Sequence, residues 1–261
     1  MRGAATVAAC VAFAAALAGG GEVRVEPSVG VVPANHLKFY LHFPGPMERG
    51  EVFRHLRLVE TDDGGGEVAE VPEPFREVEL WDETFTRLTL WFHPGRQKPG
   101  VNLNVEIGPV LEEGKRYRLE ISGKWRDERG EPLGETVRHG FVAGPVDETQ
   151  PDPAQWRVVF AGGFVRIETG EALDPESLRK RVAVVDGEGG RLAAEIEPDA
   201  TGFRLVPVRA WRPGGYRLRV DPRLEDLAGN SVARPFNVDL EKGGGKTRET
   251  AVELPFEIPR E

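Results

Sequence analysis

Apolar and polar residues alternate along several short stretches of the chain. In residues 37–43 every odd-numbered position is apolar, whereas Lys38 and His42 lie between them. Residues 87–93 and 116–122 alternate in the same way. Successive side chains of a strand point to opposite faces, so each stretch predicts a half-buried β-strand. A helical period is not convincing in any stretch of comparable length, although residues 175–181 could form one or two helical turns.

The second half of the chain repeats the apolar pattern of the first half. At an offset of 126 positions, Phe39 aligns with Val165 and Leu41 with Ile167. Further along, the best offset is 99 positions, and Tyr117 then aligns with Tyr216. Such self-similarity predicts an internal duplication, in which the first copy carries 27 residues that the second copy lacks. Much of this excess lies in residues 71–80 and 94–111, where prolines and glycines interrupt the strands.

This pattern predicts an all-β fold with two tandem immunoglobulin-like β-sandwiches joined by a short Pro-rich linker. We expect residues 154–240 to contain a complete strand set and to fold alone. The expected organisation is a signal peptide at 1–18, a first sandwich with an insertion at 22–143, a linker at 144–153, a second sandwich at 154–240, and a C-terminal tail at 241–261 that could add an edge strand.

Each repeat resembles a bacterial immunoglobulin-like domain of the surface-layer (SbsA) type. In the second repeat the resemblance lies in the late turn Leu224–Ser231, which contains Asp-x-x-Gly-Asn, and in Phe236-Asn237-Val238 as a final strand. The first repeat departs from it, because Glu131 stands where the asparagine would be. The resemblance implies a spacer or adhesive module in an exported protein, without shared catalytic residues.

The N-terminus has the pattern of an export signal. Arg2 precedes an apolar run from Ala4 to Leu17, and small residues follow at the expected cleavage site. We therefore expect a mature chain that begins near Gly19 and is secreted, periplasmic or attached to the cell surface. Lipidation at Cys10 and an uncleaved anchor are the alternatives. Because Cys10 is the only cysteine, the mature chain would contain no disulfide bond.

Composition and motifs give little support for catalysis. The formal net charge of −9 argues against a nucleic-acid partner, and no later segment is apolar for long enough to span a membrane. None of the five histidines has the spacing of a zinc site, and no nucleophile elbow is present. Asp226 and Asn230 could contribute oxygen ligands to a calcium site, but two residues supply fewer than the six to eight oxygens that calcium takes. We expect no catalytic residue, no cofactor and no metal site.

The excess residues of the first repeat contain the candidate binding residues. Loops that extend beyond a common scaffold often carry recognition, and aromatic and cationic side chains are enriched at such surfaces. Packing of this insertion on the linker and the second repeat is the structural alternative. We expect an exported, non-enzymatic structural, adhesive or binding module with an unknown protein, cell-surface or polysaccharide partner; the alternative is a carbohydrate-binding or hydrolase-accessory protein that uses exposed aromatics. The candidate binding residues are Trp81, Trp91, Arg96, Lys98 and Asn102.

Overall fold

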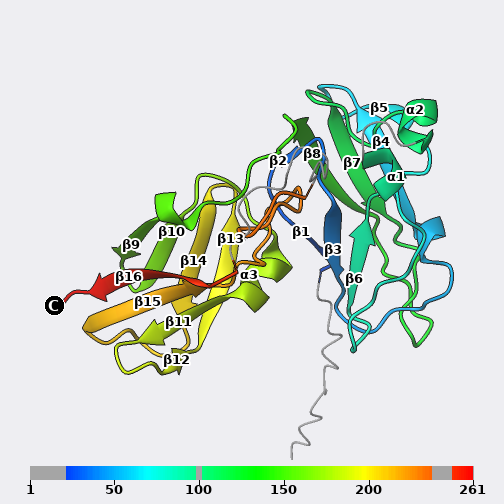
Figure 1. The fold of residues 1–261 in the computed structure, drawn as a ribbon. Helices are drawn as coiled ribbons and strands as arrows, with labels where there is room; N and C mark the ends of the chain where they lie inside the picture. Colours follow the sequence, from blue (N-terminus) through cyan, green and yellow to red (C-terminus); the bar gives the residue numbers. More distant parts are fainter. Residues whose placement is uncertain (1–21, 98–101, 237–248, 261) are drawn as a thin grey trace, which may run out of the picture.

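The structure is a computed structural model that describes residues 22–97, 102–236 and 249–260. The chain forms an all-β fold with four sheets, which pack in pairs as two sandwiches that lie side by side (Figure 1). We call the unit with strands β1–β8 sandwich 1 and the unit with strands β9–β16 sandwich 2. The expected signal peptide at 1–18 lies outside the described residues. No helix in the described ranges is long and apolar enough to cross a membrane.

Sandwich 1 packs a three-stranded sheet, in the order β1-β3-β6, against a five-stranded sheet, in the order β2-β8-β7-β4-β5. Only the short pairing of β2 with β8 is parallel among these strands. The elements of this unit are β1 (Arg24–Glu26), β2 (Val31–Pro33), β3 (Lys38–His42), η1 (Val52–His55), β4 (Leu56–Thr61), β5 (Glu67–Glu70), β6 (Arg87–Trp91), α1 (Pro94–Gln97), α2 (Asn102–Ile107), β7 (Arg116–Ile121) and β8 (Val137–Gly144).

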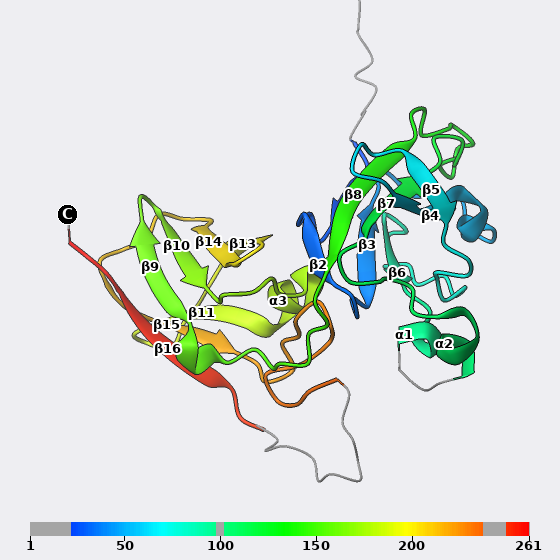
Figure 2. The ribbon, with the colours of Figure 1, turned by 90° about the horizontal axis from the view of Figure 1, so that it is seen from above.

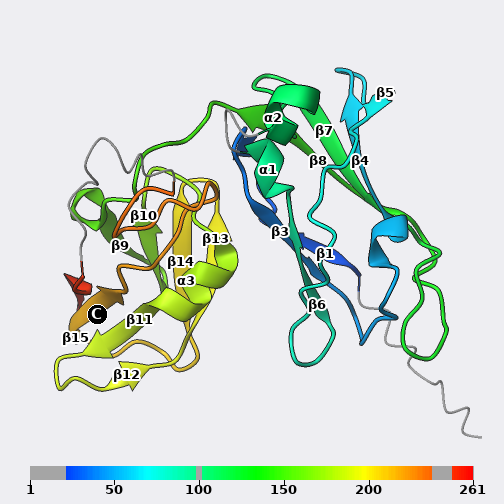
Figure 3. The same cartoon turned by 45° about the vertical axis from the view of Figure 1, so that its right-hand side comes forward.

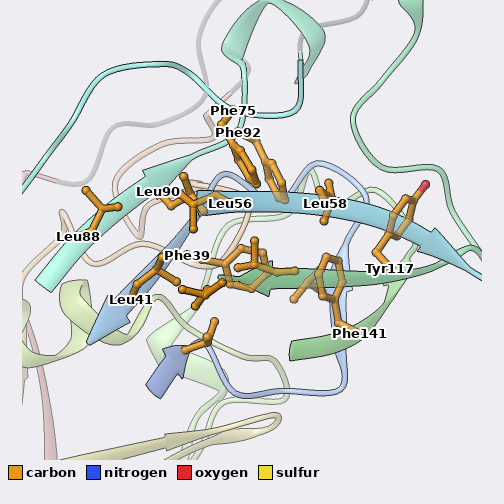
Figure 4. Close-up of a cluster of buried hydrophobic side chains, with 14 of the residues drawn as sticks. Phe39, Leu41, Leu56, Leu58, Phe75, Leu88, Leu90, Phe92, Tyr117 and Phe141 are labelled. Atoms are coloured by element: carbon orange, nitrogen blue, oxygen red, sulfur yellow. The ribbon is translucent and has the colours of Figure 1, made fainter. Parts of the chain in front are cut away.

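Alternating apolar residues form the core of sandwich 1, as the sequence pattern predicts. Phe39 and Leu41 of β3 lie opposite Leu90 and Leu88 of β6, and all four side chains are buried between the sheets (Figure 4). Strand β3 nevertheless departs from the prediction of a half-buried strand. Its Lys38 and Tyr40, which point to the opposite face, are only 9 % and 5 % exposed. Sandwich 2 covers that second face.

Sandwich 2 packs a sheet in the order β13-β14-β10-β9 against a sheet in the order β12-β11-β15-β16, and all its pairs are antiparallel. The one predicted helix is present as α3. Asp174 caps it by accepting a hydrogen bond from Ser177 N at 2.7 Å, and Pro175 occupies its first turn. The elements are η2 (Pro153–Gln155), β9 (Arg157–Ala161), β10 (Phe164–Glu168), α3 (Pro175–Arg181), β11 (Val182–Asp186), β12 (Arg191–Leu192), β13 (Ala194–Asp199), β14 (Gly202–Pro207), β15 (Gly214–Val220) and β16 (Val252–Ile258).

The last strand of sandwich 2 comes from the C-terminal tail. Strand β16 pairs with β15 over seven residues, and Ile258 is buried in the core. It takes the position that β8 takes beside β7, since Tyr216 lies opposite Phe256 just as Tyr117 lies opposite Phe141. Residues 154–240 therefore lack one strand of this sheet, and the expectation that they form a complete strand set is wrong.

The Asp-x-x-Gly turns of the two sandwiches have the same hydrogen bonds. Asp127 Oδ1 accepts from the backbone N–H groups two and four residues later, both at 2.9 Å. Asp226 Oδ1 does the same at 2.8 and 2.9 Å. The glycines Gly130 and Gly229 have φ angles of 86° and 83°, which other residues rarely adopt. Both turns thus depend on the aspartate and glycine that the sequence comparison aligned.

The excess of the first repeat lies mainly between β6 and β7. Twenty-four residues separate these strands, whereas six separate β14 from β15 at the corresponding place. The longer connection contains α1 and α2, which pack together at one end of sandwich 1 (Figure 1). Sequence analysis placed much of the excess in residues 94–111, which include both helices.

We expect a chain that ends after Thr250, and so lacks β16, to unfold at a clearly lower temperature. Burial of an isoleucine side chain such as Ile258 contributes about 1.5–3 kcal/mol, and β15 also loses its edge partner. Thermal unfolding followed by circular dichroism measures the effect. A chain that ends after Pro259 keeps β16 and is the control; equal midpoints for the two truncations would contradict the assignment.

Candidate functional site at the sandwich junction

The late turn of sandwich 2 inserts into sandwich 1. Leu227, at the tip of this turn, is 4 % exposed and belongs to the apolar core of sandwich 1. Its carbonyl oxygen accepts hydrogen bonds from Leu37 N and from His36 Nδ1, both at 3.1 Å. A Cβ atom on Gly229 would lie 2.4 Å from Leu37 Cδ1, so close approach as well as positive φ requires glycine there. The turn that the sequence assigned to sandwich 2 therefore holds both units.

His36 is neutral in this contact. Burial lowers the pKa of His36 to about 3, because the charged imidazolium would lose its hydration. Since Leu227 O can only accept, the neutral ring donates through Nδ1. The side-chain amide of Gln97 also donates to His36 O at 2.7 Å, which ties α1 to the same segment.

Polar side chains on the outer face of β3 bind the loop and helix that face them. Lys38 Nζ lies 3.0 Å from Glu225 Oε2 and 3.5 Å from Asp174 Oδ2. Tyr40 donates its hydroxyl proton to the Asp174 carboxylate at 2.9 Å. Burial and the negative charge of Asp174 raise the pKa of Tyr40, which keeps this donor protonated. Burial alone would lower the pKa of Lys38, but the two carboxylates raise it.

A second polar contact joins β1 to α3. Arg179 binds both carboxylate oxygens of Glu26 at 2.7 Å, and His42 Nε2 lies 3.1 Å from Glu26 Oε2. Burial alone would raise the pKa of Glu26, but the hydrogen bonds from His42 and Arg179 lower it to about 2. Arg87 of β6 pairs with Glu176 of α3 beside this contact. The helix is thus held to all three strands of the facing sheet.

The linker is fixed to both units by asparagines. Asp147 O accepts from the side-chain amides of Asn35 at 2.8 Å and Asn230 at 3.2 Å, and Asp147 N donates to Asn35 Oδ1 at 3.0 Å. Asn35 belongs to sandwich 1 and Asn230 to sandwich 2. The expected linker segment 144–153 is therefore part of the junction.

Among the described residues, two groups of acidic and histidine side chains bring possible metal-ligand atoms close together. In the group Glu26, His42 and Glu176, arginines already neutralise both carboxylates, so the group does not suit a cation. The other group comprises Asp147, Glu171 and Asp226, with one ligand atom from each within 4.8 Å of the others. These are ligands of the kind that calcium prefers, but they are fewer than the six to eight oxygens it takes.

The second group is electrostatically unfavourable when ionised. Burial raises the pKa of Asp226 to about 8, and Asp147 and Glu171 add to the shift although Asn230 opposes it. Burial and the charge of Asp147 raise the pKa of Glu171 to about 7. Both carboxyl groups therefore bind protons more tightly in the folded protein than in the unfolded chain.

A groove of about 880 Å³ lies beside these contacts. Sandwich 1 contributes the segment from β1 to Val29, and sandwich 2 contributes α3, β11, β12 and β13. Figures 2 and 3 show α3 and β13 on the side of sandwich 2 that faces sandwich 1. Leu173, Val184 and Leu205 of the second core lie at its floor.

The candidate binding residues from the sequence are not gathered in this groove. Trp81 is partly buried, donates to Glu79 at 3.0 Å, and contacts the ring of Trp125. Trp91 is also partly buried, and Lys38 Nζ lies 5.1 Å from its ring centroid. Neither ring is available as an open platform.

Arg96 is buried, so the expectation that it belongs to a charged recognition surface is wrong. It is 2 % exposed, and its guanidinium donates to the carbonyls of Gly108 and Pro109 at 2.9 and 2.6 Å. Its charge therefore supports the connection between α1 and β7 from within. Lys98 lies outside the described residues, and so does the side chain of Asn102.

We expect stability to fall as the pH rises through the range in which Glu171 ionises. The folded-state pKa of about 7 exceeds the reference value of 4.5, so the stabilising effect is complete below pH 4.5 and is lost above about pH 7. The variant Glu171→Gln should therefore melt higher than the parent at pH 8.5 and differ little at pH 4.5.

Calorimetric scans across this pH range measure the difference between the two proteins. Glu148→Gln, which changes an exposed acid in the linker next to Asp147, should melt like the parent at every pH. Parallel pH profiles for Glu171→Gln and the parent would contradict the assignment.

Comparison with known proteins adds little to this geometry. The sequence matches no family model and no curated protein. Among solved structures, the chain is similar to the N-terminal four Ig domains of Dscam1 isoform 6.44, with 11 % identity and a TM-score of 0.24 over 77 % of this chain and 46 % of that chain. It is also similar to the E. coli chaperone DraB, with 13 % identity and a TM-score of 0.26 over 80 % and 94 %. The resemblance to SbsA-type domains stays a prediction.

Proposed function

We propose that the protein is an exported, non-enzymatic module whose two sandwiches act as one rigid structural or adhesive element. The observation that carries this proposal is the interlocked junction, in which Leu227 of one sandwich is buried in the core of the other. Export and a relation to surface-layer immunoglobulin-like domains belong to the same proposal, and they rest on the N-terminal pattern and the late-turn motif of the sequence.

The chemistry of the junction favours one relative orientation of the sandwiches. Burial of Lys38, Tyr40 and Asp174 has a free-energy cost that their contacts with one another offset, together with the Glu225 contact of Lys38. A rotated arrangement that kept this face covered would leave at least one of these groups buried without a partner. The directional polar contacts thus select the angle between the two sandwiches, and burial of the apolar Leu227 side chain stabilises their association.

The alternative of a carbohydrate-binding protein has less support from the geometry. Sugar recognition by stacking needs an exposed indole, and each of the five tryptophans is either buried or partly buried. Trp81 and Trp91, the two candidates for that role, pack against Trp125 and Lys38. The charged groups of the junction are mostly paired with one another, which agrees with a structural role more than with catalysis.

We expect the double variant Lys38→Met and Arg179→Gln to separate the unfolding of the two sandwiches. The substitutions remove Lys38 beside Asp174 and Arg179 beside Glu26, so each buried carboxylate loses a cation that offsets its burial. Differential scanning calorimetry should show one cooperative transition for the parent and two for the variant.

The control is Arg166→Gln, which breaks the ion pair of Arg166 with Asp199 inside sandwich 2. This ion pair also joins an arginine to a carboxylate, but both residues belong to sandwich 2. The variant Arg166→Gln should therefore keep a single unfolding transition. Two transitions in the parent protein, or a single unchanged transition in the double variant, would refute the rigid-element proposal.

A further inference from the structure

The groove opens at an edge where the two sheets of sandwich 2 separate. Strand β13 ends its sheet, and no described strand pairs with its second edge. On the opposite sheet, β12 pairs with only Val184 and Val185 of β11. Val182 and Ala183 pair with β15 on one side and have no described strand on the other. Backbone groups from both sheets therefore border the apolar floor.

Residue size explains why this edge is open in sandwich 2. In sandwich 1 the residues beside β6 include Phe75 and Trp81, whose rings pack against Phe92 and Phe43 respectively. The inward positions at the corresponding place on β13 are Ala194, Ile196 and Pro198, which alternate with the exposed acids of the strand. Smaller side chains leave the space between the sheets unfilled.

We propose that this groove binds an extended peptide, which adds a strand to the edge of β13 and turns alternate apolar side chains toward the floor. Unpaired strand edges bind extended segments through main-chain hydrogen bonds, and pockets for alternate side chains provide specificity. Strand β13 is six residues long, which corresponds to about 20 Å of extended chain. Because Pro198 has no N–H group, the pairing uses the part of β13 before it.

The negative charge of β13 favours basic side chains at the outward positions of the peptide. Glu195, Glu197 and Asp199 are exposed on the outer face of this strand. Arg204 pairs with Glu197 at 2.8 Å, and Arg166 pairs with Asp199. Glu195 has no ion pair among the described residues. A neighbouring strand places its outward residues beside these carboxylates, so lysine or arginine at alternate positions is complementary to them.

The arginines that line the groove do not argue against a basic peptide. Arg24 comes from sandwich 1, Arg179 from α3 and Arg191 from β12, so none belongs to the sheet that contains β13. Arg179 is already bound to Glu26 and Glu176. The groove is also continuous with the established junction, because Glu26 and Arg179 belong to both. The peptide we infer is therefore extended, with apolar residues alternating with basic ones.

The test uses the full chain and two synthetic probes. One is a fluorescein-labelled peptide that alternates lysine and valine, and the other alternates glutamate and valine. Fluorescence anisotropy should show saturable binding of the lysine peptide, with the glutamate peptide weaker by about tenfold or more. Amide shifts in an NMR titration with the lysine peptide should concentrate on Ala194–Glu197.

Two variants locate the site. Ala194→Trp fills the groove with a ring, as in sandwich 1, and should abolish binding. Glu195→Lys should weaken binding of the lysine peptide several-fold, whereas Glu257→Lys on the edge strand β16 should not. Circular dichroism and melting curves establish that each variant is folded. If Ala194→Trp does not fold, the comparison of Glu195→Lys with Glu257→Lys alone tests whether the peptide binds at β13.

Three outcomes would overturn the proposal. The first is the absence of saturable binding by the lysine peptide. The second is equal binding of the two peptides, which would indicate adhesion without charge selection. The third is an unchanged affinity in folded Glu195→Lys, or amide shifts that concentrate on β16 instead of β13.

Discussion

Burial of the second face of β3 is the constraint on which the junction depends. A strand with Lys38 and Tyr40 on one face would ordinarily leave them in water. Here the helix α3 and the late turn cover that face, so both side chains must find partners on the other sandwich, and Asp174 and Glu225 provide them. The same aspartate caps α3, so the start of that helix and the angle between the sandwiches depend on one carboxylate.

The position of the groove follows from that arrangement. Because α3 lies against β1 and β3, the neighbouring edge of sandwich 2 faces sandwich 1, which contributes part of the groove wall. In sandwich 1 large rings close the equivalent edge, whereas in sandwich 2 small residues leave it open. Two related scaffolds can thus differ in binding capacity through the size of a few inward side chains, without a change in strand order.

The sequence predicted the strands well and the junction poorly, for a physical reason. Alternation identified β3, β6 and β7, and the Asp-x-x-Gly pattern identified both turns, because these signals are local. It could not identify Tyr40 or Arg179 as contact residues, since their partners are 134 and 153 positions away. Arg96 was assigned to a recognition surface because cationic side chains in extended loops are enriched there, whereas backbone carbonyls bind it inside the protein. An edge strand from the C-terminal tail was expected, but the sequence could not show that it completes the sheet beside β15, because that position depends on long-range pairing.

The most direct test of a rigid junction is the relative orientation of the two sandwiches in solution. Residual dipolar couplings of backbone amides, measured for the whole chain near pH 6, give an alignment tensor for each sandwich separately. A rigid unit predicts the same tensor magnitude and axes for both, with the relative orientation that the Leu227, Tyr40 and Arg179 contacts impose. Tensors of different magnitude would mean that the sandwiches reorient independently, and would contradict the account.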